Sequence, residues 1–207
     1  MPRSGAGVRR TLPLLFIVLG LALLLYVGAN YGFMYAEQRR LNVEWQKQLA
    51  ARATAANTSA PEAPVDDGLV RLSIPKIELD AVVVEGTSNR DLMRGPGRIK
   101  NTAIPGERGN AVVTAHRDTF FRHLPELHNG DSILVRRGGE VLRFEVTGKK
   151  VVLPDETSVL RETKDAQLTL ITCYPTYYIG PAPERLVVFS RLVERTPDDG
   201  TVAASQD

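Results

Sequence analysis

The 207-residue sequence has one cysteine, three histidines and no marked excess of charge of either sign. A single cysteine excludes an intrachain disulfide and a metal site of the Cys-x-x-Cys type, but it is compatible with one reactive thiol whose histidine partner lies elsewhere in the chain. The net charge is only +2 and the basic residues are scattered, so we expect no nucleic-acid partner. With 43% hydrophobic residues, the chain can bury one core, which predicts one domain with appendages.

Charge is absent from one long stretch near the N-terminus. Residues 12–29 contain no charged side chain, and the uncharged run continues to Ala36. At about 1.5 Å per residue, roughly twenty helical residues cross a hydrocarbon layer about 30 Å thick. We therefore expect a transmembrane signal anchor at residues 11–36 after a cytoplasmic N-terminus at residues 1–10. A signal peptide cleaved after Ala29 is the alternative, which the length of the apolar run disfavours.

The orientation of this anchor follows from its flanks. The flanking basic residues are Arg3, Arg9 and Arg10 before the run and Arg39, Arg40 and Lys47 after it. Their numbers are equal, but the free amino terminus and the lack of acidic residues before the run favour an N-terminus inside the cell. We expect a single-pass protein of the cell membrane whose main domain lies on the extracytoplasmic side.

The segments around the main domain are polar. Residues 37–68 are predicted to form a juxtamembrane stalk and a linker. A solvated helical continuation is expected to residue 53, whereas residues 51–68 are small and polar with two prolines, as in a linker. The main domain is predicted at residues 69–195, and the tail at residues 196–207 has too little to bury and is expected to be flexible.

Short β-forming runs recur between turn signals from residue 69 onward, which predicts an all-β barrel or sandwich. The seven runs are Leu69–Ile74, Ala81–Val84, Asn110–Ala115, Ser132–Val135, Val141–Thr147, Leu168–Thr172 and Arg185–Val193. Residues 90–93 and 117–127 are predicted to form short helices or turns. The Arg137–Glu140 segment contains two glycines and predicts a tight hairpin turn.

The single cysteine, Cys173, follows the most regular of these runs. Pro175 cannot continue a strand ladder, so we expect Cys173 at the point where the strand opens into a loop. A lone cysteine is often only a small buried hydrophobe. A nucleophilic role requires a partner, because a free thiol with a pKa of about 8.5 is only a few per cent thiolate at pH 7.

Two residues are candidates for that partner chemistry. His116 ends a predicted strand, whereas His123 and His128 lie among charged neighbours in a connecting segment. Arg185 opens the last strand, after a loop that must return the chain to the barrel end where Cys173 lies. A fixed cation there can stabilise the oxyanion formed when a thiolate attacks a carbonyl group.

Taken together, these segments resemble the sortase family, the membrane-anchored cysteine transpeptidases of bacterial surfaces. Residues 169–173 match the TLxTC motif of that family, residues 114–117 resemble its catalytic-histidine segment, and residues 183–188 resemble the segment that carries its arginine. The resemblance covers residues 69–194 and is closer to the class D or E type. It implies a mainly β fold, namely a closed eight-stranded sortase-type barrel with short helices, preceded here by one transmembrane helix.

The resemblance also implies roles. Cys173 would be the nucleophile, His116 the acid and base, Arg185 the oxyanion stabiliser and Thr172 a substrate-binding residue. The implied reaction cleaves an LPxTG-like sorting signal of an exported protein through a thioacyl-enzyme and transfers the acyl group to an amine, either of a cell-wall precursor or of a pilin lysine. We expect no cofactor and no required metal, because the acidic residues of the predicted loops form no recognisable ligand set.

Two other interpretations remain open from the sequence. The same site could act as a cysteine hydrolase that releases the acyl group to water. Alternatively, the chain could be a non-catalytic, surface-anchored β-domain with a buried and unreactive Cys173.

Overall fold

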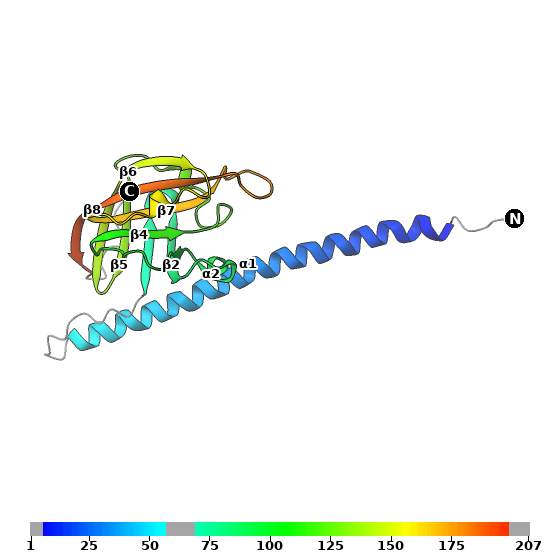
Figure 1. Ribbon diagram of the computed structural model, residues 1–207. Coiled ribbons are helices and arrows are strands. Elements are labelled where there is room, and N and C mark those ends of the chain that lie inside the picture. The colour runs from blue at the N-terminus through cyan, green and yellow to red at the C-terminus, as the bar shows by residue number, and fades with distance from the viewer. Residues whose placement is uncertain (1–5, 57–68, 199–207) are drawn as a thin grey trace.

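The computed structural model describes the backbone of residues 6–56 and 69–198, with side chains for residues 12–51 and 69–198. Within these ranges a long helix, α1 (Ala6–Ala56), lies beside a closed barrel of eight strands (Figure 1). The strands are β1 (Val70–Ile74), β2 (Leu79–Glu85), β3 (Gly97–Arg98), β4 (Gly109–Thr114), β5 (Ser132–Arg137), β6 (Glu140–Val152), β7 (Ala166–Tyr174) and β8 (Glu184–Pro197). The predicted mainly β barrel with one preceding apolar helix is confirmed.

The strand order around the barrel is β1-β2-β3-β4-β7-β8-β6-β5, and β5 closes the barrel against β1. Neighbouring strands are antiparallel except for the β2–β3 and β4–β7 pairs. Because β4 and β7 are parallel, they end at the same edge, and β8 begins there because it is antiparallel to β7. We call this edge the site edge, since all three predicted catalytic residues lie on these strand ends.

The short elements agree with the sequence in most places. All seven predicted runs form strands, and the eighth strand, β3, escaped prediction because two residues cannot show an alternating pattern. The segment at 90–93 is helix α2 (Asn89–Arg94), and residues 117–127 form turns that end in the 3-10 helix η2 (Leu124–Glu126). The remaining 3-10 helices are η1 (Pro75–Ile77) and η3 (Thr157–Leu160).

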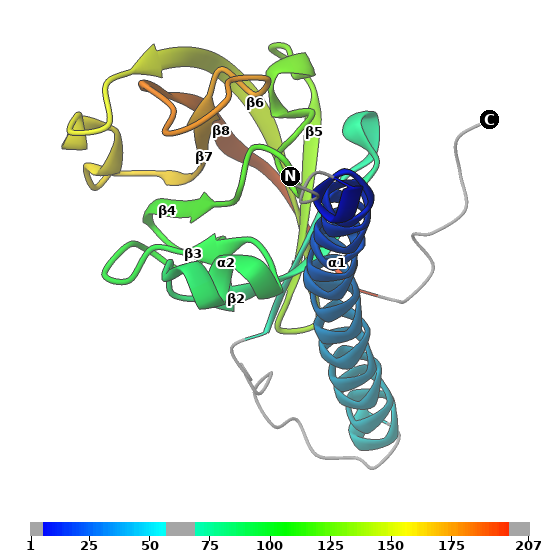
Figure 2. The ribbon, with the colours of Figure 1, turned by 90° about the vertical axis from the view of Figure 1, so that its right-hand side faces the viewer.

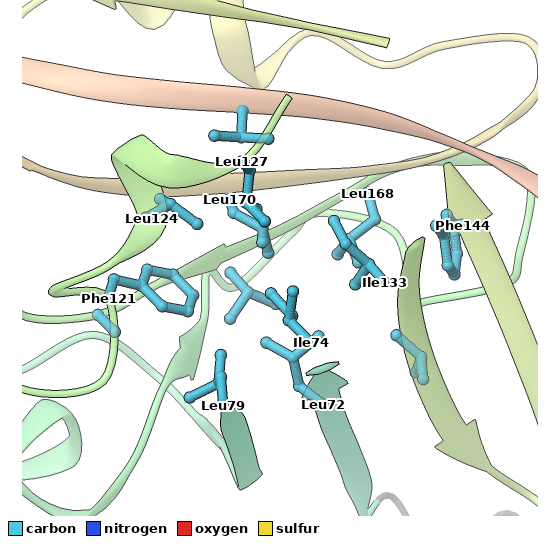
Figure 3. Packing of buried hydrophobic residues seen from close by; sticks show 14 of the residues in the cluster. Leu72, Ile74, Leu79, Phe121, Leu124, Leu127, Ile133, Phe144, Leu168 and Leu170 are labelled. Carbon is cyan, nitrogen blue, oxygen red and sulfur yellow. The ribbon is translucent and has the colours of Figure 1, made fainter. Parts of the chain in front are cut away.

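Alternation along the strands separates two apolar clusters. Inward-facing side chains, including Leu168 and Leu170 of β7, fill the barrel with residues such as Phe121 and Phe144 (Figure 3). Ile171 and Val187 point the opposite way and form a smaller cluster on the outer face of the barrel wall. Successive strand residues point to opposite faces, so each residue near the site can be assigned to the interior or to the outer face.

Helix α1 is longer and better packed than the sequence suggested. The helical continuation predicted to residue 53 extends to Ala56, so the predicted linker is wrong for residues 54–56, while residues 57–68 lie outside the described residues. The predicted solvated stalk is also wrong in part, because Trp45 is only 3% exposed. At the other end, β8 extends two residues into the predicted tail, since Thr196 pairs with Val141 and Pro197 with Glu140. The tail from residue 199 lies outside the described residues.

One face of α1 docks on the barrel beside α2 (Figure 2). Its half-buried or buried positions recur at every third or fourth residue, as one face of a helix does. They include Asn30, Met34, Gln38, Asn42 and Trp45. The docking is specific as well as apolar, because polar side chains on this face make directed bonds to the barrel.

Gln38 makes the most complete of these bonds. Its side-chain amide accepts a hydrogen bond from Val82 N (3.2 Å) and donates to Val82 O (3.3 Å) and to Arg94 O (2.5 Å). Val82 lies in β2 just before the short pairing with β3 begins at Val84. The amide therefore pairs strand groups that β3 is too short to reach, and a buried backbone group without such a partner would be costly.

Candidate active site

The predicted nucleophile and cation are cross-strand neighbours. Cys173 of β7 and Arg185 of β8 are register partners in an antiparallel pair, so their side chains lie on the same face of the sheet. Cys173 is half-buried and carries a free thiol. Alternation places both on the outer face, because Leu186, which follows Arg185, and Leu170, three positions before Cys173, belong to the interior cluster.

His116 reaches the same edge from β4. The Ala115 N–H donates to Ile171 O (3.2 Å), which continues the β4–β7 ladder one residue beyond Thr114. His116 follows directly and is half-buried. The fold thus brings together, on three adjacent strand ends, the three residues for which catalytic roles were predicted.

Thr172 has a different environment. Its side chain is 1% exposed, and its hydroxyl donates a hydrogen bond to Ala115 O (2.9 Å), the carbonyl next to His116. The residue therefore ties the nucleophile strand to the histidine segment from inside the barrel wall. The substrate-binding role predicted for Thr172 stays a prediction.

Arg185 is positioned by carbonyl groups of its own loop. Its Nη1 donates to Glu184 O (2.8 Å) and to Ala182 O (3.3 Å). These bonds occupy one nitrogen of a group that has five N–H donors. The guanidinium can consequently hold its place and still donate to an oxygen atom that bears developing negative charge.

A groove of about 210 Å³ begins at Arg185 and runs over the outer apolar cluster. Its floor consists of outward-facing strand residues, and its wall is the β6–β7 connection around η3. The lining residues are Ile99, Thr114, Val152, Leu153, Pro154, Glu156, Thr157, Val159, Leu160, Ile171, Arg185 and Val187. An apolar groove that ends beside a nucleophile and a cation suits an extended peptide with apolar side chains.

Glu156 is the one carboxylate that lines this groove. The side chain and backbone N–H of Ser158 hydrogen-bond the carboxylate and hold the pKa of Glu156 below its usual value. The group is therefore ionised at neutral pH. No group of three or more His, Cys, Asp or Glu residues able to hold a metal ion occurs in the described ranges.

A second cavity, of about 230 Å³, lies beside His116. Residues from three separate segments line it: Asn30, Tyr31 and Met34 of α1, Leu92 and Met93 of α2, and His116, Asp118 and Thr119 after β4. We call it the helix-side cavity. One of its walls belongs to the helix that was predicted to be a membrane anchor. No sequence pattern places this helix near His116.

Arg117 is a further residue that the sequence analysis did not single out. Its guanidinium donates to Pro175 O (3.4 Å), at the start of the loop between β7 and β8, and to Gly180 O (2.6 Å) within that loop. The only feature of the sequence that could have indicated a role for Arg117 is its position directly after His116. The arginine links the histidine segment to the loop that follows the nucleophile.

Comparison with known proteins agrees with this geometry. A family model described as a sortase domain matches residues 72–193. Sortase D of Bacillus subtilis (strain 168) is 37% identical over 123 residues, which are 59% of this chain and 62% of that protein. The chain thus spans less than two thirds of that curated relative.

Two solved structures are similar to this chain in fold. A sortase D5 transpeptidase of Clostridium perfringens matches with a TM-score of 0.63 at 22% identity, covering 77% of this chain and 99% of that one. A sortase C of the same species, solved with the C-terminal cell wall sorting motif, matches with a TM-score of 0.55 at 31% identity. That match covers 60% of this chain and 69% of the solved one.

Proposed function

We propose, from the premise that this chain belongs to the sortase family, that it is a membrane-anchored cysteine transpeptidase that acts on a sorting signal of exported proteins. The observation that carries the proposal is the register pairing of Cys173 with Arg185, with His116 on the adjacent strand end and an apolar groove leading to them. An unreactive structural cysteine would need none of these neighbours.

In the first step, the Cys173 thiolate attacks the carbonyl carbon of the scissile peptide bond. The negative charge that develops on the carbonyl oxygen is stabilised by the Arg185 guanidinium. His116 then donates a proton to the departing amine, the C–N bond breaks, and the acyl fragment remains on sulfur as a thioester.

In the second step, an amine takes the place of the leaving group. His116, now neutral, accepts the proton of the incoming amine as the amine attacks the thioester carbonyl, and the thiolate leaves. Because the leaving and incoming amines exchange protons with the same imidazole, both approach on the His116 side of Cys173. The helix-side cavity lies on that side, and the groove lies on the Arg185 side.

The donor substrate is proposed to be an LPxTG-like sorting signal bound in the groove. Support comes from the apolar lining of the groove and from the related sortase C that was solved with a cell wall sorting motif. The acceptor is proposed to be an amine of a cell-wall precursor or of a pilin lysine. We propose class D or E for the chain, in line with its similarity to a sortase D.

The chain is proposed to be anchored by α1 with its barrel outside the cell. Helix α1 is long and apolar enough to cross a membrane, and its apolar side chains between Leu12 and Val27 are exposed. A barrel held at the outer membrane face would meet exported donors and acceptors of the envelope there. Proteinase treatment of intact cells tests the side, since an exported barrel is degraded and a cytoplasmic one is protected.

The direct test is cleavage of peptides bearing candidate sorting signals, analysed by mass spectrometry with and without added amine. We expect Cys173→Ala to abolish cleavage while the thermal unfolding temperature stays unchanged. An amine adduct in the wild-type products indicates transfer, whereas a free acid even at high amine concentration indicates a hydrolase. Cleavage that survives in the Cys173→Ala variant contradicts the assignment of the nucleophile.

A further inference from the structure

The loop between β7 and β8 exposes an unusual run of apolar side chains. Tyr177, Tyr178 and Ile179 are 85%, 46% and 96% exposed, and residues 174–183 contain no charged side chain. On the described part of the barrel, the other exposed large hydrophobic residues are Val151, Leu153 and Val193, none of which forms such a run. A contiguous exposed apolar patch marks a contact surface, whereas scattered apolar residues do not.

The loop is held in this position. Arg117 donates to the carbonyls of Pro175 and Gly180, which flank the three residues on both sides, and Tyr178 N donates to Pro175 O (3.3 Å). These hydrogen bonds fix the loop on both sides of the tip. The exposed side chains of the tip therefore point into solvent and do not pack on the barrel.

The direction in which the loop projects identifies its partner. In Figure 1 the orange loop leaves the barrel toward the same side as the N-terminal, apolar half of α1. Figure 2, seen from that side, has the N-terminal end of α1 nearest the viewer. The loop tip thus points toward the medium that surrounds the apolar half of the helix.

The length of α1 fixes where that surface lies. The docked face of the helix begins at Asn30, and Asn30 and Tyr31 line the cavity beside His116. Residues 12–29 are the uncharged segment ahead of the docked face. At about 1.5 Å per residue they extend over roughly 27 Å, close to the hydrocarbon thickness of a bilayer. A bilayer around this segment would end next to the site edge of the barrel.

We propose that the Tyr177–Ile179 tip inserts into the interfacial layer of the membrane that α1 spans. Tyrosine suits this layer because its ring is apolar and its hydroxyl can stay hydrated, and Tyr26 and Tyr31 of α1 lie near the same end of the apolar segment. The inference rests on the proposed anchoring of α1. It gives the barrel a second attachment to the membrane and holds the entrance to Cys173 against the lipid surface.

The test uses the full chain in nanodiscs of phosphatidylcholine, compared with nanodiscs of brominated phosphatidylcholine, which quenches nearby tryptophan. Three variants each add one tryptophan: Ile179→Trp at the tip, Leu21→Trp within the apolar segment, and Val193→Trp on β8. The native Trp45 is buried against the barrel, so the unchanged chain supplies the baseline. We expect the Ile179→Trp and Leu21→Trp variants to lose fluorescence in brominated lipid and the Val193→Trp variant to match the baseline.

The outcomes separate this inference from the proposals on which it depends. If the Leu21→Trp variant is quenched and the Ile179→Trp variant is not, the loop contact is wrong and the anchoring stands. If neither is quenched, the anchoring itself fails. None of these readouts requires catalysis, so an inactive enzyme leaves the test valid. Quenching of Val193→Trp to the same extent as Ile179→Trp would also contradict a contact confined to the tip.

Discussion

The two ends of the barrel use different interactions. At the far end, where the β5–β6 turn and the end of β8 lie, arginine side chains bind carboxylates and loop carbonyls. Arg195 contacts Glu140 and Gly106 O there, and Arg137 contacts Glu107 and Pro105 O. At the site edge lie the groove over the outer apolar cluster, the helix-side cavity and the exposed apolar tip of the β7–β8 loop.

This difference indicates that the far end has a structural role and the site edge a binding role. Each exposed ion pair at the far end contributes little to the free energy of unfolding. The site edge leaves apolar surface uncovered, which a soluble barrel would avoid unless a substrate or a lipid surface covers it. Changes at the site edge should therefore affect activity or docking, and changes at the far end should affect stability slightly.

Among substitutions that leave the nucleophile in place, the largest effect is expected for Arg185→Ala. Loss of a preorganised oxyanion donor typically slows a reaction by about 10²- to 10³-fold, and we expect that loss in the rate of acyl-enzyme formation. Arg191→Ala on the same strand is the matched control, since its side chain is 61% exposed and pairs with Glu145. Equal rates for the two variants would remove Arg185 from the mechanism.

Thr172→Val tests how the nucleophile strand is tied to the histidine segment. The substitution keeps the shape but deletes the hydroxyl that bonds Ala115 O, and the buried carbonyl loses this partner. We expect a loss of about 1–3 kcal/mol in the free energy of unfolding, together with slower acylation. Thr172→Ser keeps the donor and should recover both in denaturant titrations and rate assays. Failure of Thr172→Ser to recover activity would contradict the role assigned to the hydroxyl bond.

Gly95→Ala tests the docking of α1. The backbone there is extended, so alanine causes no backbone strain, but its Cβ would lie 2.5 Å from Gln38 Nε2 and 2.7 Å from Val82 O. We expect a cost of about 1–3 kcal/mol and faster tryptic cleavage after Arg39 and Arg40. Gly148→Ala has open space around its Cβ and serves as the control. Unchanged cleavage would mean that α1 does not need the Gln38 contact.

The smallest effect is expected at the far end. The side chains of Arg195 and Glu140 are 46% and 38% exposed. Glu140→Gln should therefore lower the free energy of unfolding by less than about 1 kcal/mol and leave peptide cleavage unchanged. The difference from the wild type should shrink further in high salt. A large loss of activity would contradict the separation between the two ends.

Much of this arrangement could be predicted from the sequence. Alternation located seven of the eight strands, and the TLxTC segment with His116 and Arg185 provided three candidate catalytic residues, which the fold brings to one edge because each lies at the end of a regular run. The docked face of α1 could not be predicted, because polar residues such as Gln38 and Asn42 interrupt its apolar period, and their partners are barrel atoms remote in sequence.

Other features were present in the sequence but carried no clear meaning there. The Tyr177–Ile179 tip is an apolar triplet between prolines, which a local pattern cannot distinguish from a buried loop. Arg117 stands beside His116, but only the fold brings it to Pro175 and Gly180. The predicted linker at residues 54–56 is helical because its alanine-rich sequence favours extension of α1.

The most direct test of the central claim is the intact mass of the protein after incubation with a sorting-signal peptide in the absence of amine. Cys173 should carry the acyl fragment as a thioester, and addition of a primary amine should restore the original mass while the transfer product appears. No adduct on the wild-type chain under conditions where the peptide is cleaved, or the same adduct on the Cys173→Ala variant, would contradict a thioacyl-enzyme at this residue.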